Sequence, residues 1–144
     1  MSPEAASDFL GFLDDSTSPW HAARRISEDL ANAGFRQVAA TDPSWPSEPG
    51  AKLFLKRGGA VVAWVLPSGA ARRLTLGLAH TDSPCLRLKP NAESVSCGCR
   101  KLAVEAYGGM LNHTWFDREL VVSGKVCHDD DGWIREDLVR LDGF

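Results

Sequence analysis

Residues 52–66 read KLFLKRGGAVVAWVL, and this stretch decides the fold class. Lys52 to Arg57 mixes polar and apolar side chains in the manner of a β-strand. Gly58-Gly59 then predicts a two-residue hairpin turn. The following run, Ala60 to Leu66, contains no polar side chain and predicts a second strand that is buried on both faces. The stretch therefore predicts two antiparallel strands of a sheet.

Two amphipathic helices are predicted upstream of this hairpin. Ser2-Pro3 and Ser18-Pro19 each combine a capping serine with a proline at the first helical position. Gly34 is expected to end the second helix, since glycine is favoured just after the last helical turn. The apolar stripes have helical spacing and consist of Ala6, Phe9, Leu10 and Leu13, then Ala22, Ile26, Leu30 and Ala33.

Further strands are predicted downstream of the hairpin. A polar turn from Pro67 to Arg73 leads to a third strand, Leu74 to Ala79, which ends at His80. Beyond Lys89 the pattern is weaker; it predicts strands at Leu102–Ala106, Glu119–Val126 and the start of one at Leu138–Leu141, with a turn at Asp130–Gly132. The fold class is therefore α/β, with N-terminal helices followed by a mixed β-sheet.

Length and charge limit the classes of function. The 144 residues, of which 44% are hydrophobic, suffice to bury a core of one domain. The formal net charge of −3 and the lack of a basic block predict no binding to nucleic acid or to an anionic membrane surface. The longest apolar run, Ala60 to Leu66, is far shorter than the roughly 20 residues of a membrane-spanning helix.

The N-terminus and the cysteines indicate the cellular compartment. Residues 1–4 have neither the basic region nor the apolar core of a signal peptide, so we expect a cytoplasmic protein. The four cysteines lack the paired C-x-x-C spacing of a zinc ribbon or a thioredoxin site. In a reducing cytosol, the close pair Cys97 and Cys99 is expected to be two free thiols in a loop.

His80 and Asp82 are the sharpest candidates for chemistry. They follow a predicted buried strand, and side chains two residues apart in an extended segment point the same way. A carboxylate that accepts one ring N–H of a histidine makes the other ring nitrogen a better metal ligand. On spacing alone, the pair is equally consistent with a metal site and with a structural hydrogen bond.

Three other groups are weaker candidates. Ser18 precedes His21 by three residues, but we expect Ser18 to cap the helix and His21 to pack on its first turn. The segment 107–118, rich in glycine and aromatic residues, is consistent with a tight turn that contains an Asp-Arg ion pair, or with one wall of a binding cleft. His128 stands beside three aspartates, a pattern that favours an exposed acidic turn over a cation site.

Three motifs occur together in this order along the chain. They are SPWHA (Ser18–Ala22), AHTDSPCLRLK (Ala79–Lys89), and VEAYGG (Val104–Gly109) continuing to HTWFDREL (His113–Leu120). Together they resemble the N-terminal part of the aspartyl aminopeptidases, from about Phe9 to Leu141. The resemblance implies a cytosolic exopeptidase with two zinc ions that removes N-terminal, often acidic, residues from peptide substrates. It also implies a homo-oligomer.

The same resemblance implies a domain division and site residues. Residues 1–89 would belong to an α/β catalytic domain, and residues 90–144 would begin an inserted β domain that builds the oligomer. His80 matches the family's first zinc ligand, and Asp82 matches the catalytic aspartate that orients this histidine. Asp117-Arg118 lies in a motif that we expect to support the fold and the cleft. The chain departs from the family pattern at Met110 and Asn112, where glycine and tryptophan are usual.

The resemblance further implies that the other zinc ligands, the bridging aspartate and the glutamate base lie beyond Phe144. A catalytic zinc requires about three protein ligands, whereas the matching motif supplies one. We therefore expect the 144-residue polypeptide to be inactive alone and to bind zinc poorly. The alternative is a non-enzymatic role, as a relic or an oligomerising fragment of such an enzyme.

Overall fold

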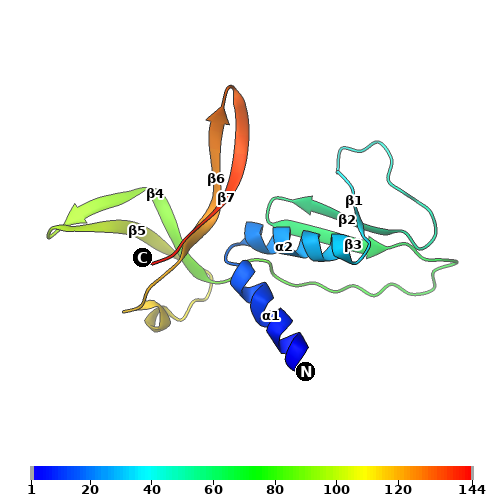
Figure 1. Cartoon of the computed structure of the whole chain (residues 1–144), viewed down its shortest axis with the longest axis horizontal. Coiled ribbons are helices and arrows are strands. Elements are labelled where there is room, and N and C mark those ends of the chain that lie inside the picture. The colour runs from blue at the N-terminus through cyan, green and yellow to red at the C-terminus, as the bar shows by residue number, and fades with distance from the viewer. Residues whose placement is uncertain (1, 144) are drawn as a thin grey trace. The chain divides into compact units, whose positions relative to one another are not determined.

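A computed structural model describes residues 2–143, which form two compact units. One unit contains the described residues up to Asp82 together with those from Val121 onward, and the other runs from Ser83 to Leu120. Two helices followed by mixed sheets confirm the predicted fold class (Figure 1). The limits of these units do not coincide with the predicted boundary between residues 89 and 90, so the division into catalytic and inserted domains stays a prediction.

The two helices begin where the Ser-Pro pairs predict. They are α1 (Pro3–Asp15) and α2 (Pro19–Asn32). The side chains of Ser2 and Ser18 each accept a backbone N–H from the first turn, at 3.2 Å and 3.3 Å, and so pair donors that a helix leaves unsatisfied. Of the helices that the structure describes, none is long and apolar enough to cross a membrane.

Gly34 ends α2 as predicted. Its φ of +81° is a left-handed conformation that glycine adopts without steric cost. The N–H of Gly34 donates to the carbonyl of Ala31, and the N–H of Phe35 donates to the carbonyl of Leu30. These two hydrogen bonds are those of a Schellman motif, which satisfies carbonyls at the end of the helix.

A three-stranded sheet follows the helices. Its strands are β1 (Arg36–Gln37), β2 (Lys52–Arg57) and β3 (Ala60–Val65), in the order β1-β2-β3. β1 is parallel to β2, and β2 is antiparallel to β3. The predicted turn at Gly58-Gly59 is confirmed, because Arg57 pairs with Ala60 across it.

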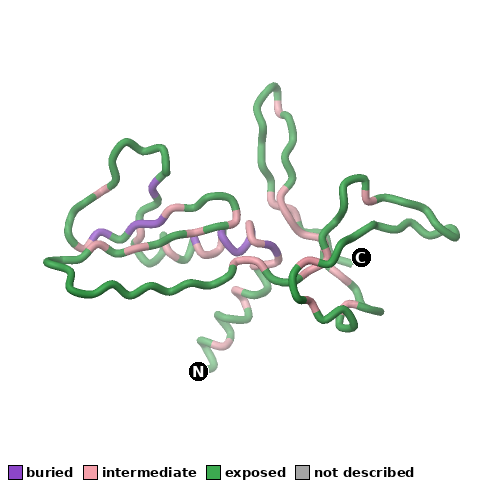
Figure 2. Tube along the Cα trace, turned by 180° about the vertical axis from the view of Figure 1, so that it is seen from behind, coloured by how far each residue is buried: buried purple, intermediate pink, exposed green. Residues whose placement is uncertain are grey.

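The buried residues lie on α2 and on and around β2, as the purple segments of Figure 2 show. Leu53 and Phe54 of β2 are only 1% and 2% exposed and are the largest fully buried side chains among the described residues. Ala22 and Ala23 of α2 are buried as well. Leu53 also clusters with Val38 and Ala51, and the partly buried side chains that pack against this cluster are Leu55, Trp64 and Leu66.

The prediction that β3 is buried on both faces is wrong. None of its six residues is fully buried, and Val62 and Val65 are exposed. β3 pairs with β2 along one edge, and no other described strand pairs with it. The apolar composition of β3 is therefore that of a central strand, but the described residues give it the surroundings of an edge strand.

The third predicted strand, Leu74 to Ala79, is also a wrong prediction. This segment forms no strand pairing in the structure. Its leucines are highly exposed, at 88% for Leu74, 73% for Leu76 and 88% for Leu78. A strand requires a neighbouring strand for its backbone hydrogen bonds, and residues 74–79 pair with none of the described strands, although one edge of β3 is open.

Two long hairpins and a short helix make up the rest. The hairpins are β4 (Cys85–Ser96) with β5 (Cys99–Tyr107), and β6 (Val122–Asp130) with β7 (Trp133–Leu141); η1 is Asn112–Trp115. The strand predicted at residues 102–106 lies within β5, and the one begun at 138–141 completes β7. The strand predicted from Glu119 starts three residues later, and the acidic turn between β6 and β7 is confirmed. β4 was not predicted.

The β6–β7 hairpin is attached to the segment that joins the two helices. The hydroxyl of Ser123 donates to the carbonyl of Thr17 at 2.8 Å. A guanidinium nitrogen of Arg140 donates to the carbonyl of Asp14, also at 2.8 Å. Residues more than one hundred positions apart are thus brought into one compact unit.

Replacing Gly59 by alanine is expected to destabilise the protein by about 1–3 kcal/mol, the usual cost of forcing an extra carbon into a packed site. A Cβ at Gly59 would lie 2.9 Å from Cβ of Pro19 and 3.3 Å from its backbone carbonyl carbon. Urea unfolding followed by circular dichroism measures this loss. Gly69→Ala is the matched control, because a Cβ there would meet no atom within 4 Å; equal effects of both variants would contradict close packing of the turn on α2.

Candidate functional site

His80 and Asp82 lie together as the sequence predicts. Nδ1 of His80 is 2.9 Å from Oδ1 of Asp82, a hydrogen-bonding distance. The His80 side chain is 90% exposed, whereas that of Asp82 is 29% exposed. With the carboxylate at Nδ1, the neutral ring carries its proton there and presents the lone pair of Nε2 outward.

Thr81, which the sequence analysis did not single out, anchors this pair. Its hydroxyl donates to the carbonyl of Gly59 in the β2–β3 turn at 2.7 Å. Thr81 lies at a bend between His80 and Asp82, and its hydrogen bond to Gly59 holds the backbone at that bend. No spacing pattern in the sequence identifies Thr81 as this anchor.

His80 and Asp82 supply only part of what a metal ion requires from a protein. His80 with Asp82 has the form of a metal-binding histidine and its orienting carboxylate. Among the residues that the structure describes, no group of three His, Cys, Asp or Glu side chains lies close enough to hold a metal. The residues present fit one ligand of a zinc site and its supporting acid, which is fewer than the three protein ligands of a catalytic zinc.

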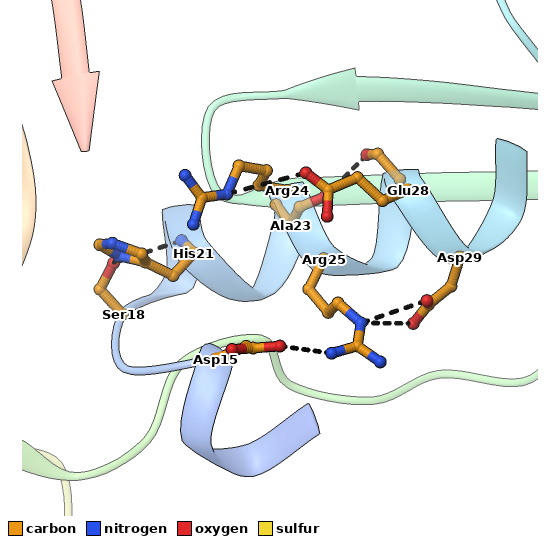
Figure 3. Close-up of polar contacts among 9 residues, drawn as sticks. Asp15, Ser18, His21, Ala23, Arg24, Arg25, Glu28 and Asp29 are labelled. Carbon is orange, nitrogen blue, oxygen red and sulfur yellow. Dashed lines mark hydrogen bonds and ion pairs between the residues drawn. The ribbon is translucent and has the colours of Figure 1, made fainter. Parts of the chain in front are cut away.

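Ser18 and His21 form a second polar pair, which is buried at the start of α2 (Figure 3). Oγ of Ser18 lies 2.7 Å from Nδ1 of His21 and also accepts the backbone N–H of His21. Because Oγ accepts from the backbone, its own proton can be donated to Nδ1 when the neutral ring carries its proton on Nε2. Ser18 is thus a helix cap and His21 packs on the first turn, as predicted.

The pKa of His21 is lowered below its ordinary value of 6.5, chiefly by burial, with added repulsion from the positive charges of Arg24 and Arg140. The unfolded chain therefore takes up a proton before the folded chain does. Stability from the neutral ring is complete above pH 6.5 and is lost as the pH falls toward the lower folded pKa. We expect the free energy of unfolding, measured in urea, to decrease between pH 7 and pH 5.

The His21→Gln variant should lose most of this pH dependence, whatever its stability at pH 7. His128→Gln is the matched control, because His128 is exposed and lies 3.5 Å from Asp137 on the β6–β7 hairpin. An acid-induced loss that is unchanged in His21→Gln and reduced in His128→Gln would contradict the assignment to His21.

The segment 107–118 adopts a tight turn. The N–H and the hydroxyl of Thr114 both donate to the carbonyl of Leu111, at 3.0 Å and 2.7 Å. Among the described residues no ion pair joins Asp117 to Arg118; the Arg118 guanidinium instead donates to the carbonyl of Thr114 at 3.2 Å. The turn is confirmed and its ion pair is wrong, and the alternative of a wall of a binding cleft stays a prediction.

His128, Asp129 and Asp130 end β6, and the exposed acidic turn that was expected follows them at Asp131-Gly132. Asp131-Gly132 occupies the loop with φ of +52° and +87°, and Asp129 accepts the N–H of Gly132 at 2.7 Å. Asp130 pairs with Arg135 across the hairpin. The carboxylates are thus used in turn geometry and surface pairing.

Comparisons with known proteins agree with the motifs. A family profile described as Aminopeptidase I zinc metalloprotease (M18) matches residues 12–143. A probable M18 family aminopeptidase 2 of Streptomyces avermitilis is 47% identical over 125 residues, which are 85% of this chain and 28% of the relative. An aspartyl aminopeptidase of Aspergillus oryzae is 39% identical over 145 residues, covering 96% of this chain and 29% of the relative.

Solved structures also match nearly all of this chain but only a part of their own length. A chain in the cryo-EM structure of the Ape4 and Nbr1 complex superposes with a TM-score of 0.81 and 32% identity, over 94% of this chain and 27% of that one. A chain of the S. cerevesiae mApe1 dodecamer superposes with a TM-score of 0.79 and 24% identity, over 94% of this chain and 33% of that one. The chain therefore spans about 30% of the length of the proteins that it matches.

Proposed function

Because the chain belongs to the Aminopeptidase I zinc metalloprotease (M18) family, we propose that it is part of a metalloaminopeptidase that removes acidic residues from the N-termini of peptides. The family match supports zinc peptidase chemistry. The preference for acidic residues is supported by the relative that is an aspartyl aminopeptidase. The observation that carries the proposal is the hydrogen bond between Nδ1 of His80 and Oδ1 of Asp82 at the edge of the first unit.

In this proposal His80 binds one of two zinc ions through Nε2, and Asp82 fixes the ring. The carboxylate holds the proton at Nδ1, which selects the tautomer that can bind a cation and raises the basicity of Nε2. Zinc, when bound, supplies a Lewis acid for the peptide carbonyl or for water. Thr81 keeps the backbone of the pair in place through Gly59.

We further propose that the 144-residue chain is inactive alone. His80 is one ligand, and a zinc peptidase site needs about three for each catalytic ion. It also needs a group that removes a proton from the attacking water. The relatives are about three times as long as this chain, so the remaining groups are proposed to lie on the part that it does not span.

Cytoplasmic location and assembly into a homo-oligomer are also proposed. The family resemblance supports both, and the structural likeness to a chain of the mApe1 dodecamer is consistent with assembly. Peptides are the proposed partners, which the match to an aminopeptidase family supports. The net charge of −3 provides no source of attraction to nucleic acid.

Zinc content tests the proposal of an incomplete site. After dialysis against zinc and then buffer, the 144-residue chain is expected to retain well below one equivalent and to leave an aspartyl anilide unhydrolysed. A chimera that joins this chain to the unmatched part of the Streptomyces avermitilis relative is expected to retain about two equivalents and to hydrolyse that anilide. Two tightly held ions on the chain alone would contradict the proposal. A chimera that binds zinc but hydrolyses nothing would favour the non-enzymatic alternative.

A further inference from the structure

The tip of the β4–β5 hairpin carries two thiols. Ser96 pairs with Cys99 across the hairpin, so Cys97 and Gly98 are the two residues of the turn. Their φ values are +53° and +75°, both left-handed, as in a type I′ turn. Asparagine or aspartate usually precedes glycine in such turns, because a residue with a Cβ is otherwise disfavoured at positive φ. Cysteine therefore occupies this position against its local conformational preference.

The two thiols are accessible and close in the chain. Cys97 and Cys99 are both free and exposed, and one residue separates them. The Cα atoms of two residues so spaced are at most about 7 Å apart even when extended, near the upper end of the roughly 4.4–6.8 Å found in disulfides, and the turn shortens this span. The hydroxyl of Ser96 donates to the sulfur of Cys97 at 3.9 Å, which places a polar group beside it. Exposure leaves both side chains able to change rotamer and meet.

We propose that Cys97 and Cys99 are a redox-active dithiol that forms an internal disulfide by exchange with a low-molecular-weight disulfide such as glutathione disulfide. The thiolate of one cysteine attacks a sulfur of the oxidant, which forms a mixed disulfide and releases one glutathione thiolate. The second cysteine, as thiolate, then attacks the protein sulfur of the mixed disulfide and releases the second glutathione. Two cysteine thiols lose two protons and two electrons, and one oxidant molecule becomes two thiols.

The other two cysteines have different surroundings. Cys85 is half-buried and lies at the opposite end of β4, where it pairs with Tyr107. Cys127 is exposed on β6, in the other compact unit. Neither has a second cysteine near it in sequence, so a mixed disulfide formed there has no resolving thiol beside it. The hairpin tip is thus the place where oxidation proceeds to an internal disulfide.

Peptide mapping tests this directly. The chain is equilibrated with glutathione buffers of increasing oxidised fraction, trapped with an alkylating reagent and digested with trypsin. Cleavage after Arg87 and Arg100, with Lys89-Pro90 resistant, isolates residues 88–100, whose only cysteines are Cys97 and Cys99. We expect this peptide to lose both alkylation sites together and to become two hydrogen atoms lighter, while Cys85 and Cys127 remain alkylated.

Single substitutions separate the two steps. Cys97→Ser and Cys99→Ser are each expected to accumulate glutathione on the remaining cysteine, since the resolving thiol is absent. Cys85→Ser and Cys127→Ser are the matched controls and should oxidise like the unsubstituted chain. The proposal is overturned if the unsubstituted peptide carries stable glutathione without an internal disulfide, if Cys97 links two chains instead, or if Cys85 and Cys127 oxidise as readily.

Discussion

The His80→Ala variant of the chimera is expected to lose at least about 1,000-fold in kcat/KM on an aspartyl anilide. Loss of a ligand removes metal stabilisation worth several kcal/mol, and each 1.36 kcal/mol corresponds to a factor of ten. The imidazole is exposed and contacts Asp82, so its removal leaves no cavity in the core. Steady-state hydrolysis and zinc content together measure the effect, and both should fall.

His128→Ala is the matched control for that experiment. His128 is also a histidine beside a carboxylate, with Nδ1 3.5 Å from Asp137, but it lies on the β6–β7 hairpin. Its replacement should leave kcat/KM within about twofold. Asp82→Asn should show an intermediate loss of about 10–100-fold in zinc affinity or activity, as expected for a group that orients a ligand. Normal turnover by the His80→Ala chimera would refute the assignment of His80.

The Phe54→Ala variant is expected to lose about 3–5 kcal/mol of stability, the usual range for a buried phenylalanine. Phe54 is 2% exposed and lies in β2, where the backbone carbonyl of Phe54 also accepts the N–H of Val38 at 2.8 Å. Since small domains are stable by only about 5–15 kcal/mol, this loss is a large fraction of the total. Urea unfolding at pH 7.5 measures the change in the free energy of unfolding.

Leu74→Ala serves as its control. Leu74 is a large apolar residue that is 88% exposed, so its truncation should change the free energy of unfolding by less than about 0.5 kcal/mol. Equal effects at Leu74 and Phe54 would mean that Leu74 packs in solution as Phe54 does. That outcome would contradict the description of residues 74–79 as unpaired.

Features that depend on neighbours in the sequence were predicted well. A serine directly before the first helical residue accepts a backbone N–H of its own helix. A Gly-Gly pair adopts turn geometry without distant partners. Ser2, Ser18, Gly34 and the turn at Gly58 are confirmed for this reason. The juxtaposition of His80 with Asp82 is also local, since the two residues are two positions apart, although Thr81 between them lies at a bend and not in the strand end that was expected.

Features that depend on distant partners were predicted less well. Burial of β3 and pairing of residues 74–79 each require a strand alongside, and within residues 2–143 β3 pairs only with β2 while residues 74–79 pair with no strand. β4 was not predicted because two residues unfavourable in a strand interrupt it: Pro90, and Asn91 with a φ of +54°. They lie where the pairing of β4 with β5 shifts register. Arg118 does not form the predicted ion pair with Asp117, because its guanidinium donates to the carbonyl of Thr114 in the preceding turn.

The unpaired segment around Leu74, Leu76 and Leu78 has a practical consequence for the isolated polypeptide. LTLGLA combines β-forming, uncharged residues with open backbone amides, which is the composition of a site for self-association between molecules. Arg72 and Arg73, directly before it, are the only charges that oppose such stacking locally. The monomeric fraction of this polypeptide, measured by analytical ultracentrifugation, should therefore fall with rising concentration and rising salt, and replacing Leu76 by lysine should restore it.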